Sequence, residues 1–245
     1  MDFYVETLFP QQVEGFLKES ITGRAIAKGI INLECLDIRN FAVNEYGKVD
    51  DTMYGGGTGM LMQCDPVYDC WKSVADKRGK APYTVYVSPK GSVFDQKKAI
   101  ELSKKDSLLI ICGHYEGIDS RVIDEICDEE ISIGDFVLTG GEIAAVTMID
   151  CISRMIPGVL PSESAFMNES HMGGTLEARQ YTKPAEWHGK AVPQVLLSGN
   201  QAAIDEHNRI DSLVETWLKR PDMLDKLEIS EEDWEKMLAI KNGLC

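Results

Sequence analysis

Two glycine-rich segments carry carboxylates at places where a small molecule could be held. Residues 110–119 read Ile-Ile-Cys-Gly-His-Tyr-Glu-Gly-Ile-Asp, and residues 131–142 read Ile-Ser-Ile-Gly-Asp-Phe-Val-Leu-Thr-Gly-Gly-Glu. Each begins as a short apolar run and ends in a loop, and the second loop opens a helix. Because glycine has no side chain, such a backbone can approach a ligand closely and hold it by its edges.

Several familiar ligand motifs are excluded. The glycine-rich residues 55–60 do not match the Gly-x-Gly-x-x-Gly pattern of dinucleotide sites, and they follow charged residues rather than an apolar strand. None of the Gly-Lys pairs at 47, 79 and 189 precedes Ser or Thr, so there is no P-loop. The four histidines are too dispersed for a recognisable zinc site. A ligand bound mainly by the backbone of loops is the option that remains.

The charge distribution leaves a nucleic-acid partner possible. The net charge of −15 opposes one, but residues 72–105 hold nine bases and three acids, whereas residues 119–135 hold seven acids and one base. A basic stretch can meet phosphates locally even in an acidic protein. The ordinary alternative is that both stretches are solvated helix faces.

The cysteines and the apolar runs indicate a cytoplasmic protein. The seven cysteines are scattered, form no Cys-x-x-Cys pair and lie partly inside apolar runs, which is typical of reduced core thiols. No apolar run approaches the roughly 18 residues of a membrane span. The first residues have neither the basic nor the apolar region of a signal peptide.

Alternating strands and helices predict an α/β domain with a mostly parallel sheet. Strands are expected at 3–9, 30–38, 83–87, 107–112 and 130–133, and helices at 13–19, 23–28, 95–105, 119–127 and 141–155. Ligands of such sheets bind at the carboxyl ends of the strands. The loops that should form a site there are residues 88–91, a predicted turn, 113–118 and 134–141.

A change of character after Leu160 predicts a domain boundary. Residues 161–174 are polar and without periodicity, as in a flexible linker. Helices are then expected at 201–219, from 221 and at 231–240. We therefore predict domains at 1–160 and 175–245, the second mainly helical.

Motifs in a fixed order resemble one bacterial enzyme family. They stand at residues 49–60, 87–91, 112–119, 133–142, 153–160, 181–184 and 192–200. Together they resemble the tRNA (guanine-N1)-methyltransferases of the SPOUT superfamily, the TrmD family. The resemblance implies a deep trefoil knot in the N-terminal domain, a homodimer, and S-adenosylmethionine (SAM) as cofactor, with a reported need for Mg²⁺. It also implies methylation of guanosine-37 in tRNAs whose position 36 is also G.

The resemblance assigns the cofactor to the three loops. The implied cofactor-binding residues are Tyr86, Ser88, Pro89, Gly113, Tyr115, Glu116, Gly117, Ile133, Gly134, Asp135, Phe136, Val137, Leu138, Gly140 and Gly141. Without the resemblance, ordinary strand-end turns would explain the same residues.

The resemblance also assigns catalytic and substrate-binding residues. Arg154 would grip the guanine, although a helix-end arginine is usually a surface charge. Glu169 stands where the family generally has the aspartate general base, and it is one methylene longer. Asp50, Gly55, Gly59 and Ser170 would contact the tRNA. Two alternatives stay open: a SPOUT enzyme for another RNA position, or a catalytically idle tRNA-binding protein if Glu169 cannot replace the aspartate.

Overall fold

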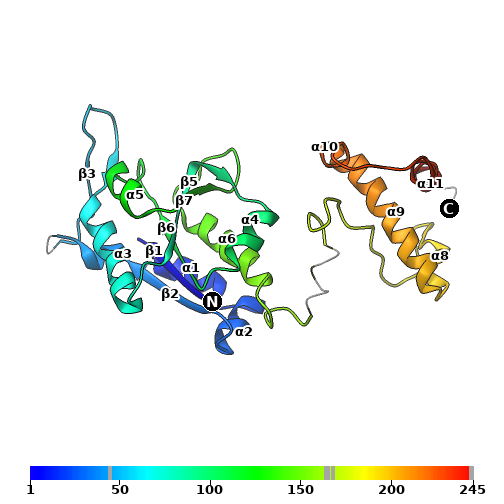
Figure 1. Cartoon of the computed structure of the whole chain (residues 1–245), viewed down its shortest axis with the longest axis horizontal. Helices are drawn as coiled ribbons and strands as arrows, with labels where there is room; N and C mark the ends of the chain where they lie inside the picture. The colour runs from blue at the N-terminus through cyan, green and yellow to red at the C-terminus, as the bar shows by residue number, and fades with distance from the viewer. Residues whose placement is uncertain (44–45, 163–165, 167–168, 243–245) are drawn as a thin grey trace. The chain divides into compact units, whose positions relative to one another are not determined.

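The chain folds into two compact units, residues 1–163 and 164–245, which are described separately below. The computed structural model describes residues 1–43, 46–162, 166 and 169–242 (Figure 1). Residues 163–165 and 167–168 of the predicted linker lie outside the described residues.

The first unit is built on a five-stranded sheet in the order β2-β1-β6-β5-β7, in which every pairing is parallel. The strands are β1 (Asp2–Thr7), β2 (Asn32–Asp37), β5 (Tyr83–Val93), β6 (Ser107–Cys112) and β7 (Glu129–Ser132). The apolar run of β6 lies at the centre of the sheet, and all six of its residues are buried. The predicted mostly parallel α/β sheet is confirmed.

Helices cover both faces of this sheet. On one face lie α1 (Pro10–Leu17), α2 (Ser20–Ala27), α4 (Gln96–Leu102) and α6 (Glu142–Arg154), and on the other α3 (Cys64–Arg78) and α5 (Ser120–Ile126). Strand side chains alternate between the two cores: Leu108 and Ile110 of β6 pack with the first group, whereas Leu109 and Ile111 pack with the second. A short 3₁₀ turn, η1 (Ile38–Phe41), follows β2.

Three features of the first unit differ from the sequence-based expectation. The helix α3 was not predicted, and neither was the antiparallel hairpin β3 (Asp50–Thr52) and β4 (Met60–Met62). The strand at 83–87 does not end at residue 88, because β5 continues to Val93 through a bulge in which Val87 and Ser92 both pair with Ile131. The predicted turn at 88–91 is therefore the looped-out part of a longer strand.

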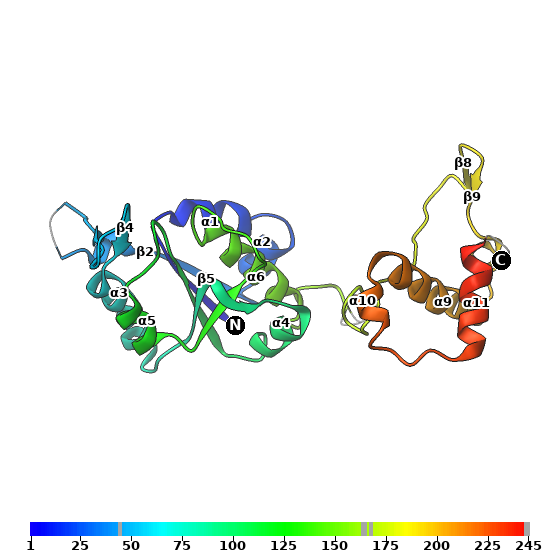
Figure 2. The same ribbon diagram turned by 90° about the horizontal axis from the view of Figure 1, so that it is seen from above.

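The second unit consists mainly of helices. Those within the described residues include α8 (Gln194–Leu197), α9 (Gln201–Lys219), α10 (Pro221–Leu224) and α11 (Glu231–Lys241), with a small hairpin of β8 (Glu186–Trp187) and β9 (Lys190–Ala191). Ile210, Val214, Leu224 and Met237 form its core. Figure 2 shows the hairpin standing away from α9 and α11. Among the described residues, no helix of either unit is long and apolar enough to span a membrane, and the six described cysteines are free thiols.

The buried carboxyl group of Glu6 predicts an unusual dependence of stability on pH. Glu6 is 0 % exposed and is the last residue but one of β1, and neither of its oxygens meets the geometry of a hydrogen bond with a described residue. Burial raises its pKa well above the usual value, and the nearby Cys70 thiol offsets only part of this. The folded protein therefore keeps Glu6 protonated at pH values at which the unfolded chain has lost the proton, so its contribution to stability falls as the pH rises through that range.

Glu6→Gln is expected to remove this loss. The relevant pH range lies between the pKa of Glu6 in the unfolded chain, near 4.5, and its raised pKa in the folded protein. In this range, the free energy of unfolding of the wild type should fall by about 1.4 kcal/mol per pH unit relative to that of the variant. Denaturant unfolding at several pH values measures the difference, with the exposed Glu125→Gln as matched control. Equal pH slopes for the wild type and Glu6→Gln would contradict the prediction.

Candidate functional site

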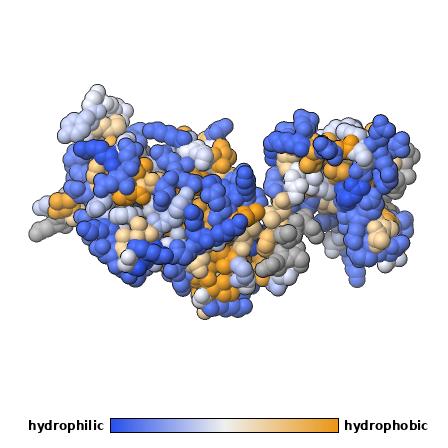
Figure 3. Space-filling model, in the orientation of Figure 1, coloured by the Kyte–Doolittle hydropathy of each residue, from blue (hydrophilic) through white to orange (hydrophobic). Residues whose placement is uncertain are grey.

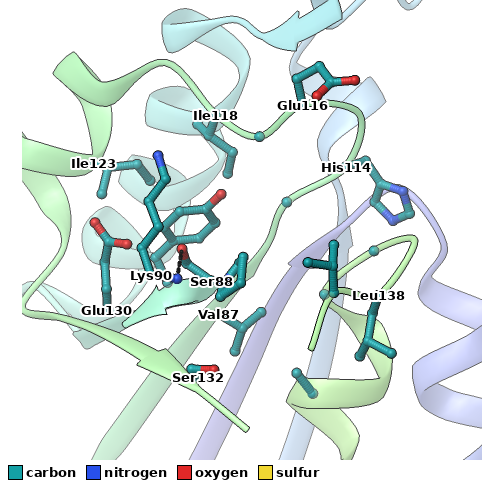
Figure 4. Close-up of a pocket in the computed structure, with 18 of the residues that line it drawn as sticks. Val87, Ser88, Lys90, His114, Glu116, Ile118, Ile123, Glu130, Ser132 and Leu138 are labelled. Carbon is teal, nitrogen blue, oxygen red and sulfur yellow. Dashed lines mark hydrogen bonds between the residues drawn. The ribbon is translucent and has the colours of Figure 1, made fainter. Parts of the chain in front are cut away.

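Two loops at the carboxyl ends of β6 and β7, together with the bulge of the neighbouring β5, enclose a cavity of about 450 Å³ (Figure 4). They are the bulge of β5 at 88–91, the loop after β6 at 113–118, and the loop after β7 that leads into α6. The strands β6, β5 and β7 are neighbours in the sheet, so their ends bring these loops to one edge.

Most residues that the sequence assigned to a cofactor line this cavity. Those that do are Tyr86, Ser88, Pro89, Gly113, Tyr115, Glu116, Gly117, Ile133, Phe136, Val137, Leu138, Gly140 and Gly141. Gly134 and Asp135 belong to the same loop but do not line the cavity. Sequence reasoning missed other lining residues, including Lys90, His114, Ile118, Ile123, Asp124 and Glu130. The signal for Lys90 and His114 was their position inside the predicted loops.

Two glycines let these loops lie against each other. A Cβ at Gly141 would be 2.6 Å from Cγ2 of Val87 and 2.7 Å from Cα of Cys112, closer than real side chains allow. A Cβ at Gly113 would be 2.8 Å from the phenolic oxygen of Tyr86. The amide of Gly141 donates a hydrogen bond to the carbonyl of Gly113 at 3.1 Å. The absence of a side chain at Gly141 therefore lets the third loop reach the end of β6, and its absence at Gly113 lets the second loop lie against Tyr86 of β5.

A buried polar cluster fastens the same two loops to β1. Nε2 of His114 lies 2.8 Å from each carboxylate oxygen of Glu142, and the hydroxyl of Thr7 donates to Glu142 Oε1 at 2.5 Å. Glu142 is the first residue of α6, where the helix dipole favours a negative charge. The ring of Phe9 meets that of His114 edge-on. We call these three residues, Thr7, His114 and Glu142, the loop clasp.

Acidic side chains outnumber basic ones around the cavity. Glu116, Asp124 and Glu130 line it together with Lys90, whose backbone amide donates to the hydroxyl of Ser88 at 3.2 Å (Figure 4). Burial, reinforced by the nearby Glu130, raises the pKa of Tyr86 to about 12, so its phenol stays a neutral donor. Ile118, Ile123, Ile133 and Leu138 supply apolar walls. Such a lining suits a ligand with cationic and apolar parts.

The hairpin β3–β4 adjoins the cavity through the loop after β6. The amide of Glu116 donates to the carbonyl of Met60, and the amide of Met62 donates to the carbonyl of Gly117, each at 3.0 Å. Met53 and Leu61 line the cavity, whereas Asp50, Gly55 and Gly59 do not. A Cβ at Gly59 would be 2.6 Å from Glu116 Oε1, so this glycine lies directly against a cavity residue.

The remaining predicted site residues are distributed between the two units. Arg154 is the last residue of α6 in the first unit and does not line the cavity. Glu169 and Ser170 belong to the second unit. There the carbonyl of Glu169 accepts a hydrogen bond from the amide of Met172, and the hydroxyl of Ser170 accepts one from the amide of Glu177. Within the described residues, no group of three or more His, Cys, Asp or Glu side chains could hold a metal ion.

Comparisons with known proteins identify the family. The family model described as tRNA (Guanine-1)-methyltransferase TrmD matches residues 1–226. The chain is 49% identical over 227 residues to the tRNA (guanine-N(1)-)-methyltransferase of Ruminiclostridium cellulolyticum, and the aligned region covers 93% of this chain and 97% of the relative. It is 46% identical to the protein of that name from Lachnospira eligens, over 92% and 96% of the two chains. The relative from Alkaliphilus metalliredigens is 45% identical over 98% and 99%. The chain therefore belongs to the TrmD family of tRNA (guanine-1)-methyltransferases.

Proposed function

We propose that the protein transfers the methyl group of SAM to N1 of guanosine-37 in tRNAs that carry G36 and G37. Membership of the TrmD family supports the reaction and the tRNA substrate. The observation that carries the proposal is the cavity formed by the bulge of β5 and the loops after β6 and β7, because most of the residues expected to bind the cofactor line it.

The cavity residues fit SAM. Gly113 and Gly141 leave backbone exposed where any side chain would collide with the opposite wall. The carboxylates of Glu116, Asp124 and Glu130 could attract the positively charged ammonium and sulfonium groups of SAM, and the ammonium group of Lys90 could attract its carboxylate. When bound, SAM supplies an electrophilic methyl group. Within the described residues, no group of three or more His, Cys, Asp or Glu side chains offers a site for Mg²⁺.

The chain's own residues then prepare the guanine. The planar fork of Arg154 can donate two hydrogen bonds to guanine acceptors and stabilise the negative charge that develops on O6. The carboxylate of Glu169 would take the proton from N1. The lone pair left on N1 would then form the new N–CH₃ bond as the S–CH₃ bond breaks, and S-adenosylhomocysteine would leave. The base must leave its stack, because N1 is otherwise inaccessible. Asp50 could accept hydrogen bonds from the neighbouring guanosine, with Gly55, Gly59 and Ser170 beside the RNA.

We infer that the enzyme is a cytoplasmic homodimer with a knotted N-terminal domain at 1–160, a linker at 161–174 and a tRNA-binding domain at 175–245. The family supports these inferences. Exposed apolar side chains on the first unit, Phe16, Val137 and Ile143, are of the kind that a subunit interface covers. Figure 3 shows apolar patches interrupting the hydrophilic surface.

The basic stretch at 72–105 is a weaker candidate for phosphate binding than its charge count suggested. Lys77 pairs with Glu34, Arg78 and Lys80 pair with Asp106, and Lys98 pairs with Glu101 and Glu129. Four of its nine bases are thus paired with acidic side chains of the protein itself. RNA contacts made there would position the tRNA without reading its sequence.

The experiment that tests the function is methyl transfer from labelled SAM to a tRNA transcript with G36 and G37, with a G37-to-A transcript as control. Label on the first transcript alone, mapped to N1, is the expected result. Transfer to neither transcript by a protein that binds SAM would contradict the proposal and favour another RNA target or an idle binding protein.

Breaking the loop clasp is expected to weaken cofactor binding. Glu142→Gln removes the negative charge and replaces one of the two carboxylate oxygens that contact His114 and Thr7 by an amide nitrogen, which cannot accept a hydrogen bond. The Kd for SAM, measured by calorimetry, should rise about tenfold, which corresponds to about 1.4 kcal/mol. The matched control is Glu34→Gln on the edge strand β2, which breaks only the surface ion pair between Glu34 and Lys77 of α3. An unchanged Kd in folded Glu142→Gln would refute a role for the clasp in shaping the cavity.

A further inference from the structure

The helix α9 buries polar side chains that its hydrophobic core does not use. Ile210 and Val214 pack with Leu224 and Met237 in the core of the second unit. On another side of the helix, Asp211 is 1% exposed and Thr216 is 0% exposed. Buried polar groups are retained where they have partners, so this side of α9 must be satisfied by another segment.

That segment is residues 175–179, which follow Glu169 closely in the chain and lie along α9 (Figure 1). The amide of Leu176 donates to the hydroxyl of Thr216 at 2.9 Å, and the hydroxyl of Ser212 donates to the carbonyl of Leu176. Because Ser212 and Thr216 are one helical turn apart, their hydroxyls can bind both the N–H and the C=O of Leu176. We call residues 175–179 the strap.

The strongest contact of the strap is the ion pair between Arg179 and Asp211. The backbone amide of Arg179 donates to Asp211 Oδ2 at 2.8 Å, and its Nε donates to Oδ1 at 2.9 Å. Its Nη2 contacts the same oxygen, Oδ1. The carboxylate thus holds both the backbone and the side chain of Arg179, which fixes the orientation of the strap as well as its place.

Two hydrogen bonds connect the strap to the turn that carries Glu169. The hydroxyl of Ser170 accepts from the amide of Glu177 at 3.1 Å, and the amide of His171 donates to the carbonyl of Thr175 at 2.9 Å. His171 has a φ of +75°, and this left-handed conformation lets the chain turn back. The residue next to Glu169 is therefore tied to the strap, and the strap is tied to α9.

We propose that Arg179 and Asp211 are positioning residues for the carboxylate of Glu169. The inference rests on the proposed function, in which Glu169 accepts the N1 proton. Because the turn at 169–172 is held through the strap, loss of the ion pair should displace Glu169 from its place in the reaction. Misplacing a catalytic group by about 1 Å can lower a rate by about a hundredfold.

The test compares two aspartates of the second unit that both pair with an arginine. Asp211→Asn weakens the pair that holds the strap, whereas Asp233→Asn weakens the Arg209–Asp233 pair between α9 and α11. In full-length protein with saturating SAM and tRNA, Asp211→Asn should lower the single-turnover rate at least about tenfold. Asp233→Asn should stay within about twofold of the wild type. The Kd for SAM should change in neither, because the cavity lies in the first unit.

A second variant keeps the test valid if Asp211→Asn fails to fold. Ser212→Ala removes a bond to the strap without leaving a buried charge unpaired, and should lower the same rate. Wild-type rates in either folded variant, or an equal loss in Asp233→Asn, would overturn the proposal.

A double variant separates positioning from simple stabilisation. In a Glu169→Gln background, Asp211→Asn should cause no further loss, because the group it positions is already inactive. An additional loss of the same size would show that Asp211 acts independently of Glu169 and would overturn the inference. A wild-type rate for Glu169→Gln alone would instead refute the general base of the proposed function.

Discussion

Replacing Glu169 by glutamine is expected to lower the single-turnover rate of methyl transfer by a factor of about 10² to 10⁴. Glutamine keeps the shape of the side chain, but its amide cannot accept the N1 proton. The Kd for SAM should remain unchanged, since the cavity is lined entirely by residues of the first unit. The exposed Glu228→Gln in the same unit as Glu169 is the matched control.

The variant Glu169→Asp shows how the site uses the longer side chain. A rate above that of the wild type would mean that glutamate is merely tolerated at a position suited to aspartate. A large loss would mean that the surrounding chain has adapted to the extra methylene. If Glu169→Gln were as active as the wild type, another group would have to act as the base.

Mixing two inactive variants should restore activity. Arg154→Ala removes the guanine-orienting group and Glu169→Ala removes the base, so each homodimer should be inactive. If each active site takes Arg154 from one subunit and Glu169 from the other, a heterodimer contains one intact site and one doubly impaired site. Random mixing makes about half of the dimers mixed, so about a quarter of the wild-type activity should return.

Two affinity tags on the two chains allow the heterodimer to be purified and assayed alone. Differently tagged copies of Arg154→Ala, mixed in the same way, serve as the control. A purified heterodimer without activity would show that both residues of each site come from a single chain.

Most of the sheet could be predicted from the sequence because β1, β5 and β6 contain short apolar or β-branched runs, at residues 3–5, 83–87 and 108–112. The helix α3 was missed for the opposite reason. Its buried residues Val67, Cys70 and Val74 follow helical spacing, but acids, bases and Pro66 surround them and hide the apolar stripe. The hairpin β3–β4 was missed because its strands have only three residues, too few for a periodic pattern.

The cofactor loops were predicted through the motifs they carry, whereas the contacts that shape the cavity were not. Glu142 meets His114 and Thr7, which are 28 and 135 residues away in the chain, and no local pattern reports such a contact. Lys90 and Glu130 likewise reach the cavity only because β5 and β7 are paired. Glu6 did leave a visible signal, a single acid inside the apolar run of β1.

Because of the bulge in β5, the length of the binding loop at 88–91 does not determine the register of the sheet. Since Val87 and Ser92 both pair with Ile131, the strand resumes its pairing where it left off. Lengthening or shortening the intervening segment would alter one wall of the cavity without turning any core residue of β5 towards solvent. The cavity can thus be remodelled, by evolution or by design, independently of the scaffold that carries it.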